Sequence, residues 1–294
     1  MSKRGRAVPA KIVLATCQFR IERQVKKNLA SMTRQMHAAK KRGAHLVHFS
    51  EACLSGYLGA ELKSAREMNW AEVREAMQEI LTLARGLKVW VVVGCNHKLS
   101  GKHKPHNSLY VINDRGKLVS RYDKMFCAGD DDKSGDLEHY TPGQEFTTFQ
   151  VRGVKCGLLI CHDFRYPELF REYKKQGVEL MLVSFHNAGM TRNSYDHYGT
   201  TVPATLQAAA ASNYFTVSAN NSTRRHAWPS FVVRADGIVV NRAPAHRDTA
   251  LITTIDPHAK LYDASVAWRR RCMAGTYHSG RLVKDPRSRD RKSL

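Results

Sequence analysis

Three side chains that could carry out covalent chemistry stand where predicted strands end. Glu51 follows the run LVHFS, Lys124 follows VSRYD, and Cys161 follows GLLI. A thiol attacks a carbonyl as its thiolate, so it needs a base or a nearby positive charge. A carboxylate can take the thiol proton and later activate water. An ammonium group can stabilise the oxyanion that the attack creates. These residue types together suit hydrolysis through a covalent acyl intermediate.

Each of the three residues also has an ordinary structural interpretation. A Glu after a strand often lies in a solvated loop, a Lys in a basic chain is usually on the surface, and a Cys after apolar residues is often an inert core thiol. Open α/β sheets bind their ligands beyond the carboxyl ends of the strands. The coincidence of all three at strand ends therefore favours a site.

The elements that must position these side chains alternate between strands and helices. In the first half, strands are predicted at 11–18, 45–50, 89–96, 108–113 and 117–122, and helices at 22–42 and 70–87. In the second half, strands are predicted at 147–151, 154–160, 179–185, 214–220 and 249–255, a hairpin at 230–240, and helices at 167–176 and 202–213. Two halves of similar order predict an α/β fold, a four-layer α-β-β-α sandwich of two mixed sheets with the helices outside. No linker rich in Gly, Ser or Pro divides the chain. We expect one domain over residues 11–280, with basic tails at 1–10 and 281–294.

Composition narrows the classes of function. The 294 residues carry a formal net charge of +21, which attracts polyanions non-specifically. No nucleic-acid-binding signature accompanies this charge, so no specific nucleic-acid partner is expected. Seven cysteines without metal-ligand spacing indicate a reducing compartment, and no stretch approaches the length of a membrane span. The sequence therefore predicts a cytoplasmic protein with no metal, no cofactor and no membrane partner.

Four stretches of the sequence resemble motifs of the carbon–nitrogen hydrolase (nitrilase) superfamily. HFSEACLSGY is similar to its glutamate motif, RYDKMF to its lysine motif, and GLLICHDFRYPEL to its nucleophile motif. YTPGQEFTTFQVRGVKCG follows the Pro-Gly hairpin that precedes the nucleophile strand in that family. The resemblance runs from about Ile12 to Thr254, with the motifs in the family's order.

The resemblance implies a role for each of these residues. Glu51 would be the base, Lys124 the oxyanion donor and Cys161 the nucleophile, with a thioester intermediate and release of ammonia. Family members use a second glutamate from the loop before the Pro-Gly hairpin, and Glu138 is the only glutamate there. Glu138 as one more charge on a solvated loop remains an alternative. The resemblance also implies a homodimer or a larger homo-oligomer.

The residues after Cys161 bear on the choice between amide and nitrile. Nitrile-hydrolysing members typically have Trp-Glu there, whereas this chain has His162 and Asp163, which is closer to amidases and N-carbamoyl hydrolases. Arg165 occupies a position where some of these enzymes hold a substrate carboxylate, and a guanidinium binds carboxylate bidentately. Pairing of Arg165 with Glu168 or another structural acid is the alternative. Further pocket candidates are His162, Tyr57, Phe126, His186 and Asn187.

The sequence thus favours a hydrolase of a small linear amide or N-carbamoyl compound that carries a carboxylate. Two alternatives remain open. One is a nitrilase that acts on a small nitrile, and the other is a non-catalytic binding protein on the same fold.

Overall fold

The computed structural model describes residues 9–131, 133–187, 191–223 and 227–292. The chain forms two units, Met1–Tyr262 and Asp263–Leu294. The first unit contains all the strands, and it ends at Tyr262, whereas the sequence placed the end of the domain at residue 280. Most of the predicted N-terminal tail, residues 1–8, and the last two residues of the predicted C-terminal tail lie outside the described residues.

The first sheet holds six strands in the order β12-β1-β2-β3-β4-β5. Its strands are β1 (Ile12–Gln18), β2 (Leu46–Phe49), β3 (Trp90–His97), β4 (His106–Ile112), β5 (Leu118–Asp123) and β12 (Thr249–Ile255). β1, β2 and β3 run parallel, and the outer pairs are antiparallel. All four residues of β2 and most of β1 and β3 are buried. This burial on both faces explains their nearly continuous apolar sequences.

The second sheet holds six strands in the order β11-β10-β9-β8-β7-β6. Its strands are β6 (Thr148–Val151), β7 (Val154–Ile160), β8 (Leu180–Ser184), β9 (Thr216–Asn220), β10 (Phe231–Val233) and β11 (Val239–Arg242). β7, β8 and β9 run parallel at its centre. The carboxyl end of β7, where Cys161 follows, is therefore next to the carboxyl end of β8.

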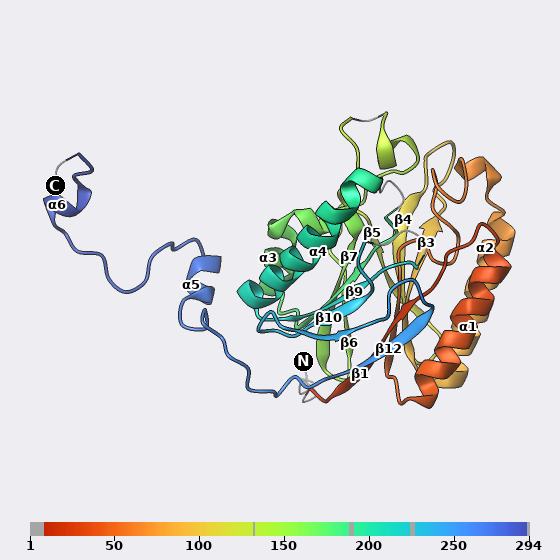
Figure 1. The fold of residues 1–294 in the computed structure, drawn as a ribbon, viewed down its shortest axis with the longest axis horizontal. Coiled ribbons are helices and arrows are strands. Elements are labelled where there is room, and N and C mark those ends of the chain that lie inside the picture. Colours follow the sequence, from red (N-terminus) through yellow and green to blue (C-terminus); the bar gives the residue numbers. More distant parts are fainter. Residues whose placement is uncertain (1–8, 132, 188–190, 224–226, 293–294) are drawn as a thin grey trace, which may run out of the picture. The chain divides into compact units, whose positions relative to one another are not determined.

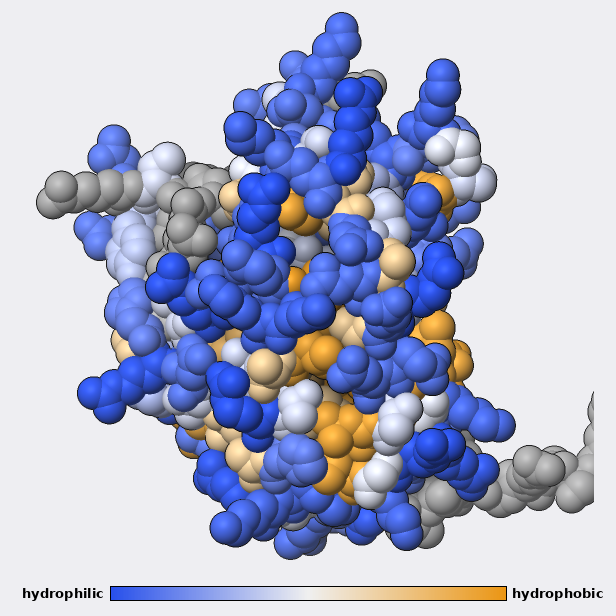
Figure 2. Space-filling model, turned by 90° about the vertical axis from the view of Figure 1, so that its right-hand side faces the viewer, coloured by the Kyte–Doolittle hydropathy of each residue, from blue (hydrophilic) through white to orange (hydrophobic). Residues whose placement is uncertain are grey.

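Four helices cover the outer faces of the two sheets (Figure 1). α1 (Val25–Lys41) and α2 (Trp70–Leu87) pack on the first sheet, and α3 (Pro167–Lys175) and α4 (Arg192–Asn213) on the second. In α1, Val25, Met32 and Met36 point inward at helical spacing. The opposite side of α1 carries five Lys and Arg residues and no acid, and Figure 2 shows hydrophilic side chains projecting from this face. The predicted four-layer α-β-β-α sandwich is confirmed.

The helix predicted over residues 202–213 is longer in the structure. α4 begins at Arg192 and continues through Pro203. Proline is favoured in a first helical turn and disfavoured in a helix interior, which is why the sequence pattern suggested a later start. The added turns matter because they bring Tyr198 to the candidate site.

Polar side chains join the two sheets where they face each other. Thr16 of β1 and Ser218 of β9 share a hydrogen bond of 2.8 Å between their hydroxyl oxygens. His48 of β2 contacts Ser218 through Nδ1 at 3.0 Å and Ser184 of β8 through Nε2 at 2.9 Å. Burial lowers the pKa of His48 to about 3, so its ring is neutral at physiological pH. These bonds fix the two sheets in one register.

The second unit contains two short helices, α5 (Arg269–Met273) and α6 (Pro286–Arg289). Within it, Arg269 forms an ion pair with Asp263. Among the described residues, no helix has both the length and the apolar character needed to cross a membrane.

Candidate active site

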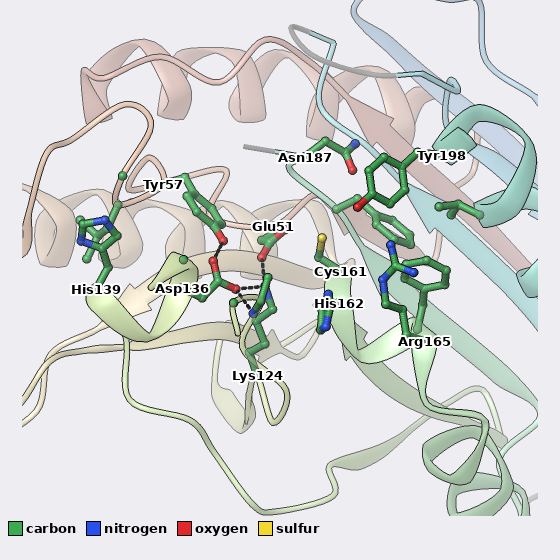
Figure 3. Close-up of a pocket in the computed structure, with 18 of the residues that line it drawn as sticks. Glu51, Tyr57, Lys124, Asp136, His139, Cys161, His162, Arg165, Asn187 and Tyr198 are labelled. Atoms are coloured by element: carbon green, nitrogen blue, oxygen red, sulfur yellow. Dashed lines mark hydrogen bonds and ion pairs between the residues drawn. The ribbon is translucent and has the colours of Figure 1, made fainter. Parts of the chain in front are cut away.

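A cavity of about 400 Å³ opens where β2, β5, β7 and β8 end (Figure 3). Glu51, Lys124 and Cys161 all line it, so the structure brings together the three residues that the sequence singled out. The first two lie in loops of the first sheet, and Cys161 follows a strand of the second. Their side chains point toward one another across the base of the cavity (Figure 3).

The turn that carries Glu51 packs closely against β3. A Cβ at Gly94 of β3 would lie 2.1 Å from the carbonyl oxygen of Ser50, so only glycine fits beneath this turn. The Glu51 carboxylate is fully buried, and its Oε1 accepts hydrogen bonds from Lys124 Nζ at 3.1 Å and from Asn107 Nδ2 at 2.8 Å. Its Oε2 has no hydrogen-bond partner among the described residues. One carboxylate oxygen thus fixes the side chain, and the other is available to a reacting group.

Lys124 lies between two carboxylates. Its Nζ is 3.1 Å from Glu51 Oε1 and 2.6 Å from Asp136 Oδ2, and only 1% of the residue is exposed. Burial alone would lower the pKa of Lys124, but the negative charges of Glu51 and Asp136 outweigh it and hold the pKa well above its ordinary value. The group is therefore a permanent ammonium at the base of the cavity.

Asp136 was not among the residues chosen from the sequence. It lies in a short 3₁₀ helix, η2 (Gly135–Glu138). Its Oδ2 accepts the backbone N–H of Ala128 at 2.8 Å as well as Lys124 Nζ, and its Oδ1 accepts the Tyr57 hydroxyl. Burial opposes ionisation of Asp136, yet Lys124 and these donors keep its pKa below the ordinary value.

The acid of this loop that contacts Lys124 is Asp136, whereas the sequence singled out Glu138. The Glu138 side chain is 63% exposed at the rim of the cavity, and its Oε2 lies 3.9 Å from His139 Nε2. In a 3₁₀ helix with three residues per turn, side chains two positions apart point in different directions. Only one of these two acids can therefore face inward. The family resemblance implied a glutamate in this loop, so the sequence did not single out Asp136.

Cys161 begins a second 3₁₀ helix, η3 (Cys161–Arg165), directly after β7. Its φ is 43°, a left-handed conformation that is unusual for a residue with a Cβ. Burial and the charge of Glu51 raise the pKa of the thiol, while Lys124 and the backbone N–H of His186 act in the opposite direction. The thiol is therefore protonated at rest, and its proton must leave during attack on a substrate.

Asp163 stabilises the turn that presents Cys161. Its buried carboxylate accepts hydrogen bonds from Ile160 N at 3.0 Å, Phe126 N at 2.8 Å and Tyr122 OH at 2.8 Å. Burial raises its pKa to about 6 despite these donors. The residue thus belongs to the turn that presents Cys161.

Arg165 lies at the end of the cavity away from Lys124 (Figure 3). Its guanidinium carbon is 5.2 Å from the ring of Phe164 and 5.2 Å from the ring of Tyr198. Within the described residues it forms no ion pair, with Glu168 or with any other acid. Two aromatic faces therefore hold the guanidinium in place and leave its N–H groups available to a ligand.

The remaining predicted pocket residues divide into two groups. Tyr57, His162 and Asn187 line the cavity. Phe126 does not, because its ring is stacked on Tyr166 with centroids 3.7 Å apart. His186 does not line it either, because its ring stacks on Tyr57 and its side chain, facing Glu61, is only 4% exposed. The structure therefore does not place these two predicted residues in the wall of the cavity.

The apolar wall of the cavity was missed in the sequence. It comprises Leu58, Phe164, Phe185, Val202 and Trp228. These residues come from five separate segments, and no local pattern links them.

The fold and the site define the class of this protein. Residues 13–260 match the carbon–nitrogen hydrolase family, and the chain belongs to that family. It is 30% identical over 169 residues to an (R)-stereoselective amidase of Pseudomonas sp, a match that covers 57% of this chain and 55% of the relative. It is 27% identical over 176 residues to the N-carbamoylputrescine amidase of Solanum lycopersicum, covering 58% of this chain and 57% of the relative. The chain spans about half the length of the curated relatives it matches.

Solved structures confirm the fold. A crystal structure of an amidase from Nesterenkonia sp. superposes with a TM-score of 0.71 at 20% identity, over 85% of this chain and 92% of the amidase. At this identity the likeness shows a shared architecture.

Proposed function

We propose that this protein hydrolyses the C–N bond of a small linear amide or N-carbamoyl compound, with Cys161 as the nucleophile. The observation that carries the proposal is a buried ammonium, Lys124, held between two carboxylates and facing a thiol at the base of a cavity. The similar Nesterenkonia amidase, 19% identical with a TM-score of 0.71 over 87% of this chain and 93% of that one, has been solved with the acetamide moiety of fluoroacetamide on its active-site cysteine. This precedent supports the same role for Cys161.

The first half of the reaction forms a thioester. Cys161 Sγ attacks the amide carbon while Glu51 Oε2 takes the thiol proton. The carbonyl oxygen becomes an oxyanion, stabilised by Lys124 and by the backbone N–H that follows Cys161. Glu51 then gives the proton to the departing nitrogen, the C–N bond breaks, and ammonia leaves.

The second half releases the acid. Glu51 takes a proton from water, the resulting hydroxide attacks the thioester carbon, and the C–S bond breaks. The thiolate takes the proton back from Glu51. Because the same carboxylate acts in both halves, its fixed Oε1 and its available Oε2 are both needed.

Asp136 supports this chemistry through Lys124. With only Glu51 as a partner, the ammonium would lose all of its compensating negative charge each time Glu51 became protonated. Asp136 remains ionised and keeps Lys124 charged through the whole cycle. This division of roles explains why two acids contact one lysine.

The decisive experiment measures ammonia release by the wild type and by Cys161→Ala. Substrates should include amides, N-carbamoyl acids and nitriles of matched length. We expect ammonia from amides or carbamoyl compounds in the wild type and none in the variant. Release from nitriles alone would identify a nitrilase. No release from any of them, together with tight binding of one, would favour a non-catalytic binding protein.

A matched pair of substitutions tests the assignment of Asp136. Asp136→Asn removes the charge that faces Lys124, and we expect kcat/KM to fall by about a hundredfold or more, since a buried charge loses its partner. Glu138→Gln, two residues away on the rim, should change kcat/KM by less than about threefold, as is typical of an exposed side chain. Steady-state ammonia release by the two variants measures both. The opposite ranking would return the role to Glu138.

Arg165 determines the substrate class in this proposal. Its unpaired guanidinium suits an acid that carries an amide or carbamoyl group at a fixed distance. A charged hydrogen bond typically contributes about 1.5–3 kcal/mol, so the wild type should prefer the acid to its neutral ester by about tenfold to a hundredfold in kcat/KM. Arg165→Met should remove most of this preference.

The measurement is a two-by-two comparison of enzyme and substrate, evaluated as a coupling energy. If the substitution impairs acid and ester equally, the coupling is zero. Arg165 would then support the turn after Cys161 and would not select the substrate.

A further inference from the structure

The candidate catalytic residues are divided between the two sheets. Glu51 and Lys124 follow strands of the first sheet, whereas Cys161 follows a strand of the second. No element contains both the base and the nucleophile. Their separation therefore depends on what joins the two sheets at this end of the sandwich.

A buried side-chain pair makes that connection behind the cavity. His186, just after β8 of the second sheet, places Nε2 2.9 Å from Oε2 of Glu61, which lies in the loop after β2 of the first sheet. Both side chains are only 4% exposed. A buried polar pair of this kind is costly to form unless its geometry is good, and it then specifies one arrangement.

Each partner also contacts the site directly. The backbone N–H of His186 lies close enough to the Cys161 thiol to act toward a lower pKa of that thiol. The His186 ring stacks on the ring of Tyr57 with centroids 4.7 Å apart and an interplanar angle of 26°. Oε2 of Glu61 accepts the backbone N–H of Tyr57 at 3.1 Å. His186 therefore touches the nucleophile on one side and the first-sheet loop on the other.

The loop contacts continue to the lysine. The Tyr57 hydroxyl donates to Asp136, and Asp136 binds Lys124. A continuous series of contacts thus leads from the Cys161 sulfur through His186, Tyr57 and Asp136 to the ammonium. Every contact in the series is between residues of the protein, so no substrate is needed to complete it.

The hydrogen-bonding pattern places the ring proton of His186. Nδ1 is buried and has no hydrogen-bond partner among the described residues, whereas Nε2 faces a carboxylate. A proton on Nδ1 would be a buried donor without an acceptor. The proton that faces Glu61 is therefore the one on Nε2.

We propose that His186 and Glu61 are positioning residues that set the distance between Cys161 and its base, through the 2.9 Å contact by which they join the two halves of the site. The effect on turnover rests on the proposed hydrolase function, but the effect on the reactivity of Cys161 does not. A misplacement of about 1 Å between reacting groups can cost about a hundredfold in rate. Loss of the hydrogen bond should therefore lower kcat far more than it changes KM.

Three variants separate positioning from stability. His186→Phe keeps an aromatic ring against Tyr57 but removes the donor to Glu61. Glu61→Gln keeps an oxygen that can accept from both His186 and Tyr57, so the connection survives without the charge. The double variant His186→Phe/Glu61→Gln removes both the buried charge and the connection.

A control variant removes an inter-sheet hydrogen bond elsewhere. Thr16→Val deletes the 2.8 Å bond to Ser218, which joins the same two sheets deeper in the sandwich. Thr16 does not line the cavity. The control should lower the melting temperature with little effect on kcat.

Two rates are measured for each protein, together with the melting temperature. One is ammonia release, resolved into kcat and KM. The other is alkylation of Cys161 by iodoacetamide, with the modified residue identified by mass spectrometry. In this second reaction an S–C bond forms, iodide leaves, and Glu51 takes the thiol proton, so it reports the geometry of base and nucleophile without a substrate.

We expect His186→Phe and the double variant to lose about tenfold to a hundredfold in kcat and in alkylation rate, with KM within about twofold of the wild type. Glu61→Gln should retain most of both rates. The double variant should melt at a higher temperature than His186→Phe, because it no longer holds a buried carboxylate that has lost its contact with His186, yet it should remain slow.

If both rates and the melting temperature recover together in the double variant, the proposal is overturned. Lost stability would then explain the slow turnover and the slow alkylation of His186→Phe. Wild-type rates in His186→Phe would also overturn it. If the wild type releases no ammonia, the proposed function fails, and the alkylation rates alone still support or reject the positioning role.

Discussion

Cys161→Ala is expected to abolish ammonia release, by about 10⁴-fold or more, because no other described group can form the acyl intermediate at this place. Cys161→Ser should be nearly as inactive, since a hydroxyl is too weakly acidic for a carboxylate base. Both variants should fold normally, because each trims or replaces one small side chain at the cavity. Steady-state ammonia release and thermal unfolding check the two statements.

The reactivity of the seven cysteines gives an independent control. Burial raises the pKa of Cys17, Cys53, Cys95 and Cys156, and it raises that of Cys161 as well. Acidity alone therefore does not distinguish Cys161, and its advantage must come from the adjacent Glu51 and Lys124. Alkylation at neutral pH should be fastest at Cys161. Substantial activity in either variant, or equal alkylation of all seven thiols, would remove Cys161 from its role.

Lys124→Met should lower kcat/KM by about a thousandfold or more, since one oxyanion donor typically contributes about 3–4 kcal/mol. Lys124→Arg should also be strongly impaired, because the planar guanidinium does not fit a fully buried site shaped for an ammonium. These losses appear in kcat measured by ammonia release. Near-normal turnover by the Arg or Met variant would exclude the oxyanion role.

Lys124→Met should also destabilise the fold, in contrast to substitution of a surface lysine. It leaves Glu51 and Asp136 buried without their shared cation, a change that typically costs about 3–5 kcal/mol. Lys124 lowers the folded-state pKa of Asp136, so the stability it gives is present at neutral pH and is lost as pH falls through that folded-state pKa. Denaturant unfolding of wild type and variant should therefore differ most at neutral pH and converge on acidification. A difference that does not depend on pH would contradict this.

The sequence was most informative where a residue's environment is local. Strand positions follow from apolar runs, and each catalytic candidate is attached to the end of such a run, so Glu51, Lys124 and Cys161 could be predicted from their neighbours. The layer order follows because helices with one apolar side must cover the sheets.

The sequence did not predict in which direction side chains point in irregular and short 3₁₀ segments. Asn187 lines the cavity and its neighbour His186 does not, although both follow the same strand. Asp136 and Glu138 differ in the same way within one turn of η2. In loops no fixed period relates position to direction, so adjacent candidates cannot be separated by sequence alone. The apolar wall could not be predicted from the sequence for a second reason. Val202, Trp228 and Phe164 line the same cavity only because the tertiary fold brings distant segments together.

The backbone at Cys161 has a consequence for how this protein can change. A left-handed φ of 43° costs a residue with a Cβ roughly 1–2 kcal/mol, and glycine would adopt it freely. The position of the proposed nucleophile is therefore one at which the backbone favours glycine over any residue with a Cβ. A change to glycine there would relieve the strain and would also remove the thiol that the proposed chemistry needs. A more stable variant that keeps Cys161 must therefore gain its free energy of unfolding at other positions in the sandwich.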